Sequence, residues 1–411
     1  MDVMQLPYLT SEFPGIGGVI KQRDEDFFVQ EIPLYEPSGE GEHVYAEIQK
    51  IGASTFDAIR RIGSALRVSS RDIGYAGLKD ARALTRQVVS IQGTTPEAVM
   101  ALQLPDLTVQ WAARHTNKLR LGHLWGNRFA IKIRQVNPTD VVRLPPLLKV
   151  LTERGMPNYF GEQRFGRRGD NALLGAALIA ADDNRLLHLL LGSPNPELDD
   201  AAAMESRQAF DRGDLESALN RFPRHCGMEC RVLARLIKTG NPAAAVKSID
   251  EKIRRLWVSA LQSELFNQVV ARRIGSLDQV QNGDLACKHE NGACFLVEDA
   301  AVESPRANRF EISPTGPMIG YRMPLPQGRP LDIEQQVFAG RDLKPDHFRL
   351  AGHHKVKGVR RPLRVKPTEV DLSAGVDDQG AHITLAFALP AGSYATSLLR
   401  EVMKTDSTSQ H

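Results

Sequence analysis

The chain of 411 residues has little cysteine and no long apolar segment. Four cysteines are too few for a disulfide framework in a chain of this length, so we expect a reducing, cytoplasmic setting. The longest purely apolar run, residues 172–181, is about half of the roughly 20 residues that a membrane helix needs, which argues against a spanning segment. No Lys or Arg precedes Lys21, and this polarity argues against a secretory signal.

The common signatures of cofactor and metal sites are also missing. No glycine-rich phosphate loop, H-E-x-x-H, G-x-S-x-G or paired-carboxylate pattern occurs. Cys226 and Cys230 have a spacing that loosely fits a zinc site, but Cys287 and Cys294 do not. We therefore expect buried free thiols, no metal and no cofactor.

The composition is that of a globular protein with more than one domain. Hydrophobic residues make up 42% of the chain and charged residues 25%, a balance that argues against wholesale disorder. A chain of 411 residues exceeds what one hydrophobic core usually holds, so two domains are expected.

Positive charge is concentrated although the net charge is only +3. Residues 107–139 contain no Asp or Glu, and residues 344–366 contain only one. Basic stretches that converge in space would bind phosphates, whereas separate ones would simply be solvated faces and strand edges. A third, short basic run contains Arg164, Arg167 and Arg168. We single out these three residues, with Lys118 and Arg120 of the first stretch, as candidate phosphate contacts.

Strand and helix signals alternate at both ends of the chain. Strands are expected within 19–32, 43–48, 87–91 and 127–136, and a helix is expected to begin at Ser54 with Phe56, Ile59, Ile62 and Leu66 as its buried face. Helical spacing dominates 172–191 and 251–277, and strands return within 361–365 and 381–389. These patterns predict an α+β fold whose first domain, 1–155 and 356–411, is interrupted by a largely helical α+β domain, 156–355.

One carboxylate lies in a glycine-flexed loop between two expected strands. The segment 74–82 contains Asp80 with Lys79 and Arg82 as neighbours. Nearby cations stabilise an ionised carboxylate, which suits a nucleophile or a base. An Asx turn or a cap would use the same residue type, so the residue types alone leave both readings open.

Two further segments combine aromatic, glycine and basic residues. Residues 158–168 suit phosphate binding and base stacking, or equally a packed junction into the inserted domain. In residues 118–129, the Asn127 amide could read a base edge, or the residue could simply form a turn.

Together and in this order, six segments resemble the TruD family of tRNA pseudouridine synthases. The resemblance extends from Lys21 to Lys404 and is carried by residues 25–32, 77–80, 122–129, 158–166, 316–318 and 389–396. It implies a pseudouridine-synthase domain with a mixed, mostly antiparallel sheet flanked by helices, a family-specific insertion domain, and an RNA cleft between the two. It also implies isomerisation of uridine 13 of certain tRNAs, with tRNA as the partner.

The resemblance also assigns site residues. The family's catalytic aspartate falls on Asp80, and its substrate contacts fall on Phe27, Asn127 and Tyr394. Phe129 resembles a further pocket aromatic. Lys21 and Glu25 are candidate charged partners of the carboxylate. Some relatives have Phe where Tyr394 stands, and the segment 194–348 is longer than in compact bacterial members.

The chemistry fits these residue types. The target uridine must leave the RNA stack, and aromatic faces can replace the lost stacking at ~1–3 kcal/mol per base. Asp80 then attacks C6 or C1′, or acts as a base, and the sequence leaves these three routes open. A catalytically silent tRNA-binding or folding protein is the alternative function. We expect a monomer without an obligate protein partner.

Overall fold

The computed structural model describes residues 6–350 and 355–405, and in it the chain forms two compact units. One unit comprises Tyr8–Met156 together with the chain from Val365 onward, and the other comprises Pro157–Arg364 with the residues up to Pro7. We call them the sheet unit and the inserted unit. The division at 156/157 and 364/365 is observed, whereas catalysis in one unit and a family-specific insertion in the other remain predictions.

The sheet unit is built on one mixed, mostly antiparallel sheet. Its strand order is β13-β14-β6-β1-β4-β2-β5, with β3 paired to β4. Only the β1–β4 pair is parallel among the pairings described. The strands are β1 (Phe27–Pro33), β2 (His43–Ile51), β3 (Ile73–Tyr75), β4 (Leu84–Gln92), β5 (Leu107–His115), β6 (Leu124–Arg134), β13 (Thr368–Asp377) and β14 (Gly380–Pro390).

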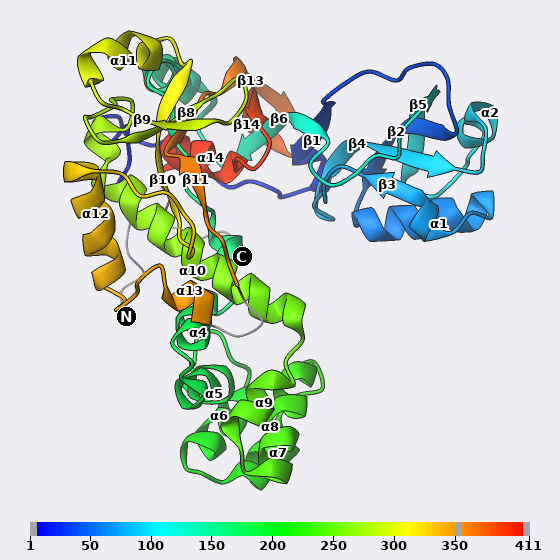
Figure 1. Ribbon diagram of the computed structural model, residues 1–411. Coiled ribbons are helices and arrows are strands. Elements are labelled where there is room, and N and C mark those ends of the chain that lie inside the picture. Colours follow the sequence, from blue (N-terminus) through cyan, green and yellow to red (C-terminus); the bar gives the residue numbers. More distant parts are fainter. Residues whose placement is uncertain (1–5, 351–354, 406–411) are drawn as a thin grey trace. The chain divides into compact units, whose positions relative to one another are not determined.

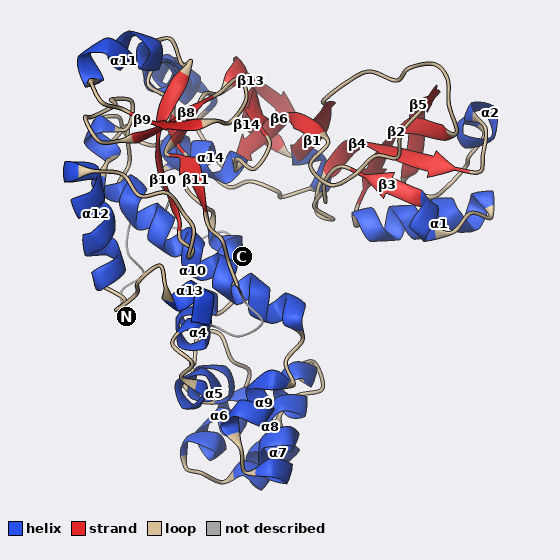
Figure 2. Cartoon of the chain, in the orientation of Figure 1, coloured by secondary structure: helices blue, strands red, loops and turns tan. Residues whose placement is uncertain are grey.

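Helices flank this sheet (Figure 2). They are α1 (Thr55–Leu66), α2 (Pro96–Met100), α3 (Leu144–Glu153) and α14 (Ala395–Met403). The hydroxyl of Ser54 accepts a hydrogen bond from the Asp57 amide, which starts α1 as the sequence predicts. Ile59 and Ile62 of α1 pack on Val44, Ala46 and Ile48 of β2, and burial of these side chains joins helix and sheet.

The inserted unit is largely helical. Its long helix α10 (Glu251–Arg272) contacts α4 and β10 (Figure 1). A four-stranded sheet has the order β11-β10-β8-β9. The remaining elements are α4 (Asn171–Ile179), α5 (Asp183–Leu191), α6 (Ala201–Asp211), α7 (Leu215–Arg221), α8 (Gly227–Thr239), α9 (Pro242–Lys247), β8 (Leu285–Lys288), β9 (Cys294–Leu296), α11 (Ala300–Asn308), β10 (Ile312–Met318), α12 (Gly328–Ala339), α13 (His347–Leu350) and β11 (Val359–Pro362). The strands β7 (Met156–Pro157) and β12 (Arg364–Val365) contain the two later unit boundaries.

The α+β class is confirmed, and three local expectations need correction. Phe56 is 59% exposed and does not belong to the buried face of α1. The expected helical stretch 172–191 is two helices, because Ala181 has a φ of 54° and Asp182 caps the second helix. The sequence analysis also missed β13, an edge strand, although Val370, Leu372 and Val376 alternate with polar residues at the spacing of a strand.

A buried arginine joins three parts of the sheet unit. Arg134 ends β6, and its guanidinium donates to both carboxylate oxygens of Asp26, at 2.6 and 2.7 Å, and to those of Asp377. Burial alone would raise the pKa of Asp26, but hydrogen bonds from Arg134 and the Arg23 amide lower it overall. The start of β1, the end of β6 and the end of β13 are therefore held by one cation.

We predict that Arg134→Met destabilises the sheet unit by about 3–5 kcal/mol, because it leaves the Asp26 carboxylate buried without its counter-charge. Arg128→Met is the matched control on the same strand: its pair with Glu369 is about half exposed, so its loss should cost at most about 1 kcal/mol. Urea unfolding, followed by fluorescence of Trp111 and Trp125 in a Trp257→Phe background, measures both. Equal effects of the two substitutions would contradict this assignment.

Candidate active site

Asp80 lies in the loop that connects β3 to β4, within the sheet unit. Its side chain is 50% exposed, and Lys21 Nζ donates to Asp80 Oδ2 at 2.8 Å. Two side chains hold the loop backbone. Thr55 Oγ1 accepts from the Lys79 amide at 3.0 Å, and Lys50 Nζ donates to the Asp80 carbonyl at 3.1 Å. The loop thus presents an accessible carboxylate from a fixed backbone.

Lys21 connects this carboxylate to an aromatic cluster. Its ammonium lies 4.4 Å from the centroid of the Phe27 ring, close enough for a cation–π interaction. Phe27 meets Phe129 edge to face at 6.4 Å between ring centroids, and Phe129 stacks on Phe387 at 5.2 Å. Only 5% of Phe27 and 7% of Phe129 is exposed. The cluster therefore forms the packed floor beneath Lys21 and Asp80.

Asn127 is oriented by a buried ion pair. Lys79 Nζ lies 2.8 Å from Glu31 Oε2 and also donates to Asn127 Oδ1 at 2.8 Å. Burial raises the pKa of Glu31, and attraction to Lys79 opposes that rise. Because an ammonium group can only donate, it fixes the amide oxygen of Asn127 toward Lys79. The amide oxygen is therefore the acceptor for Lys79, and the Asn127 NH₂ group is the donor end of the side chain.

The other two predicted site residues are Tyr394 and Glu25. Each lies next to a strand of the same sheet, and neither makes a described contact with Asp80. Tyr394 precedes α14 and is partly buried. It follows the turn where the Ala391 amide donates to the Trp125 carbonyl, beside the Gly126–Pro390 pairing that precedes Asn127. Glu25 is exposed in the short 3₁₀ turn before β1. In the described residues, its carboxylate forms no ion pair with Lys21 or any other group.

The candidate phosphate-binding residues are partly committed to other contacts. Arg164 donates to Ser259 and Ser263, and Arg168 pairs with Asp170 and Asp199, all within the inserted unit. The exposed residue Arg167 donates to the Leu198 carbonyl at 2.7 Å, whereas Lys118 donates to the Arg71 carbonyl and Arg120 is exposed in the sheet unit. Arg167, Lys118 and Arg120 retain the positions best suited to an external anion.

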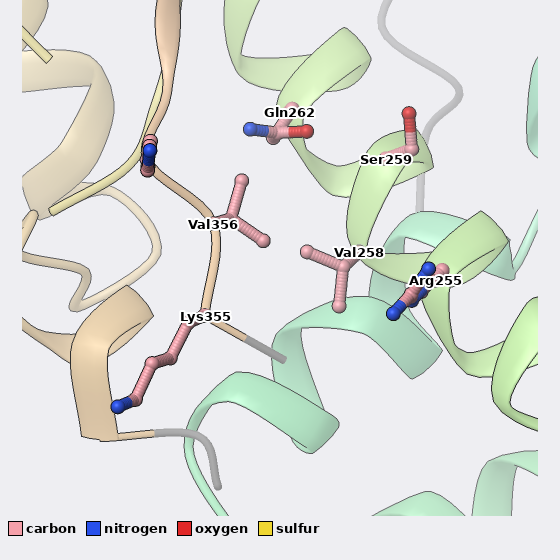
Figure 3. A pocket seen from close by; sticks show the side chains of 7 residues that line it. Arg255, Val258, Ser259, Gln262, Lys355 and Val356 are labelled. Carbon is pink, nitrogen blue, oxygen red and sulfur yellow. The ribbon is translucent and has the colours of Figure 1, made fainter. Parts of the chain in front are cut away.

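A cavity in the inserted unit is lined by further basic residues. It has a volume of about 350 Å³ and lies between α10 and the segment 355–357. Its lining includes Arg255, Lys355 and Lys357, and Val258 and Val356 point toward one another across it (Figure 3). It lies apart in sequence from Asp80, and no described residue of the sheet unit lines it.

Neither a metal cluster nor a spanning helix occurs in the described part of the chain. No three His, Cys, Asp or Glu side chains in residues 6–350 and 355–405 are placed to share an ion. None of the helices in these two ranges is long and apolar enough to cross a membrane. Cys226 and Cys287 are buried as expected, whereas Cys230 is partly buried and Cys294 is exposed.

Comparison with known proteins identifies the family. The family model for tRNA pseudouridine synthase D (TruD) matches residues 3–402. A tRNA pseudouridine synthase D from Geobacter metallireducens is 50% identical over 398 residues, covering 97% of each chain. One from Thermus thermophilus is 38% identical over 97% of this chain and 92% of its own. A crystal structure of the corresponding Methanosarcina mazei protein superposes with a TM-score of 0.86 at 29% identity, covering 98% of this chain and 99% of that one.

These matches cover both units, so they concern the whole architecture and not one domain. They are matches to pseudouridine synthases, the class that the six segments of the sequence resemble. The chain belongs to the TruD family.

Sequence reasoning missed Lys50 and Thr55, which hold the Asp80 loop. Both are buried, with only 1% of each residue exposed. Burial lowers the pKa of Lys50 to about 8, although attraction to Asp80 opposes this shift. The lysine follows Val44, Ala46 and Ile48 at a spacing of two, so the strand pattern placed it on the core face.

We predict a pH-dependent stability difference between the native protein and Lys50→Met. The Lys50 pKa is about 8 in the fold and 10.5 when unperturbed, so the unfolded chain binds this proton more tightly. As pH rises from about 8 to about 10.5, the native protein should therefore gain up to about 3 kcal/mol of unfolding free energy relative to the variant. Urea unfolding of the sheet unit at a series of pH values measures this gain.

Lys149→Met is the control, because the Lys149 side chain is 72% exposed. Its difference from the native protein should stay constant over the same pH range. A constant difference for Lys50→Met as well would show that Lys50 is not a desolvated cation.

Proposed function

We propose that this protein isomerises uridine 13 of tRNA to pseudouridine, with Asp80 as the catalytic carboxylate. The observation that carries the proposal is the Asp80–Lys21 pair above the Phe27 ring in a chain that matches TruD along its length. The sheet unit would carry the chemistry, and the inserted unit would contribute to tRNA binding. As an enzyme of tRNA, the protein would act in the cytoplasm, and we propose that it does so as a monomer.

The reaction breaks the N1–C1′ bond, rotates the uracil and joins C5 to C1′, so C5 loses its hydrogen. The half-exposed Asp80 carboxylate can reach an everted nucleotide, either as a nucleophile at C1′ or C6 or as a base. The three routes share one requirement, an ionised carboxylate beside the sugar and the base. Lys21 Nζ donates to Oδ2 at 2.8 Å and so holds one oxygen of this carboxylate in place.

The remaining predicted residues suit the pyrimidine. The Asn127 NH₂ group, oriented by Lys79, is a donor that matches a carbonyl oxygen of uracil and mismatches an exocyclic amine. Phe27 is covered by the Lys21 ammonium, so a base that stacks on this ring must first displace that ammonium. Displacement of Lys21 would then couple base entry to a change in the partner of Asp80. We propose Tyr394 as the second stacking surface and Phe129 as the support of Phe27.

We predict that the protein releases tritium from tRNA whose uridine 13 alone carries tritium at C5, and that Asp80→Asn lowers the rate at least about 100-fold. Asparagine can still accept from Lys21, so the loop should stay folded. Asp72→Asn is the matched control, since Asp72 is exposed in a nearby 3₁₀ turn, and it should react at the native rate. We expect EDTA to leave the rate unchanged.

The same assay separates the alternatives. Tritium release only from tRNA labelled at uridines other than 13 would support the family activity and refute the position. A protein that binds tRNA but releases no tritium from either substrate would be the silent binding protein. If Asp80→Asn released tritium at the native rate, Asp80 would not be the catalytic carboxylate.

A further inference from the structure

The backbone of the catalytic loop has two buried anchors outside the loop. Lys79 and Asp80 lie between β3 and β4 and belong to neither strand. The amide of Lys79 donates to Thr55 Oγ1 at 3.0 Å, and the carbonyl of Asp80 accepts from Lys50 Nζ at 3.1 Å. Hydrogen bonds thus hold two consecutive residues, one through its main-chain N–H group and the other through its main-chain carbonyl. This arrangement fixes the direction of both side chains, Lys79 toward Glu31 and Asp80 toward Lys21.

Lys50 is a costly residue for its location. It lies near the end of β2, is 1% exposed, and donates to the Ala53 carbonyl at 2.6 Å as well as to that of Asp80. In the described part of the chain, the ammonium forms no ion pair. A desolvated cation whose hydrogen-bond partners are main-chain carbonyls costs free energy that an apolar side chain would avoid. What the lysine adds at this position is its hold on the loop.

Thr55 is fixed just as firmly. It is the first residue of α1, and its hydroxyl donates to Gln87 Oε1 at 2.9 Å while accepting from the Lys79 amide. Gln87 lies on β4 and is fully buried. The hydroxyl orientation is therefore set from the sheet. Both anchors come from regular elements, β2 and α1, that pack in one core, which is the support that a reacting group requires.

We propose that Lys50 and Thr55 are positioning residues, which hold the main chain of Lys79 and Asp80 so that the Asp80 carboxylate faces the reacting nucleoside. This inference rests on the proposed function for its reaction but concerns different residues. The anchors touch no substrate. They act on the reaction only through the placement of Asp80, and a misplacement of about 1 Å can cost about 100-fold in rate.

The test compares Thr55→Val with Thr55→Ser, and Lys50→Met with the native protein. Valine keeps the shape of threonine but cannot accept from the Lys79 amide, whereas serine can. We expect Thr55→Val and Lys50→Met to lower kcat for tritium release about 10- to 100-fold, with KM and tRNA affinity within about twofold of native values. Thr55→Ser should restore most of kcat. Single-turnover assays and filter binding give these quantities.

Ile48→Ala is the control for lost stability, because Ile48 is fully buried on β2 and touches neither anchor bond. Per folded molecule, its kcat should be native. The proposal would be overturned if Thr55→Val had the native kcat. It would also be overturned if the activity of Thr55→Val and Lys50→Met fell only in proportion to the fraction of each variant that is folded. If Lys50→Met fails to fold, the two Thr55 variants still decide. If Asp80→Asn is inactive while Thr55→Val is fully active, the positioning role fails and the proposed function stands. If Asp80→Asn is active, the catalytic role of Asp80 in the proposed function fails instead.

A separate observation concerns two cysteines in the inserted unit. Cys287 of β8 and Cys294 of β9 are directly paired across an antiparallel ladder. The Lys288 amide donates to the Ala293 carbonyl at the next position, which makes the cysteine pair a non-hydrogen-bonded one. Cα atoms in such pairs lie about 4.5 Å apart, within the range that a disulfide spans. The strands therefore need no rearrangement to be joined.

The two thiols have different environments. The Cys294 thiol donates to the Gly292 carbonyl and the Cys287 thiol to the Lys288 carbonyl. Interaction with Cys287 lowers the pKa of Cys294 to about 7 against the effect of burial, and Arg360 lowers it further. Interaction with Cys294, together with burial, raises the pKa of Cys287. Cys294 is exposed and Cys287 is buried. An accessible thiolate beside a second thiol is the arrangement of cysteines that react reversibly with oxidised thiols.

We infer that Cys287 and Cys294 form a redox-active dithiol that glutathione disulfide oxidises. The Cys294 thiolate attacks one sulfur of glutathione disulfide and releases one glutathione thiolate. Cys287 then loses its proton, attacks Cys294 in the mixed disulfide and releases the second glutathione. Two protein thiols are oxidised, one glutathione disulfide is reduced to two glutathiones, and a Cys287–Cys294 bond closes the hairpin.

The test treats the full-length protein with glutathione disulfide and maps the product by intact mass and peptide mass spectrometry. We expect the loss of two hydrogens, a linked 287–294 peptide, and reversal by dithiothreitol. In Cys287→Ser the reaction should stop at a glutathione adduct on Cys294. Cys294→Ser should react with glutathione disulfide at about one tenth of the native rate or below it. Cys226→Ser/Cys230→Ser is the matched control and should oxidise like the native protein, because the pKa values of both those thiols are raised. Four unmodified thiols in the treated native protein, a stable adduct, or a Cys226–Cys230 bond would each overturn the inference.

Discussion

The arrangement of the candidate active site depends on one buried ammonium group. Lys79 adjoins Asp80, but its side chain lies buried in the sheet unit, where it meets Glu31 and Asn127. An ion pair with 5% and 1% exposed side chains is costly to break, because removal of either partner leaves an unpaired buried charge. The inward direction of residue 79 makes residue 80 point outward. The orientation of the Asn127 amide follows from the same contact.

Much of this could be read from the sequence because it depends on local patterns. The Ser54 cap, the alternation of Phe129, Ile131 and Ile133 on β6, and the glycine-flexed Asp80 loop are signals within a few residues. The roles assigned to Phe27, Asn127 and Tyr394 came from resemblance, and they stay predictions. The α+β class followed from the order of such patterns, and the fold confirms it.

What the sequence could not show are partners that are distant along the chain. Arg168, a candidate phosphate contact, is paired with Asp199, which lies 31 residues away. The role of Lys50 could not be read from the sequence, because the Asp80 carbonyl to which it donates lies 30 residues on. Strand β13 is a different case, because Val370, Leu372 and Val376 alternate with polar residues and so carry a local strand signal.

The discontinuity of the sheet unit affects how the chain is made. Strand β6 pairs with β1 on one edge and with β14 on the other, yet β14 begins at Gly380, after the whole inserted unit. At roughly 5–20 residues per second, the ribosome needs about ten seconds or more to synthesise the intervening segment. During that interval the growing chain holds β6 with one unsatisfied edge, an open template for wrong pairing. The nascent protein therefore has a vulnerable period, which ends only when the last fifty or so residues emerge from the exit tunnel.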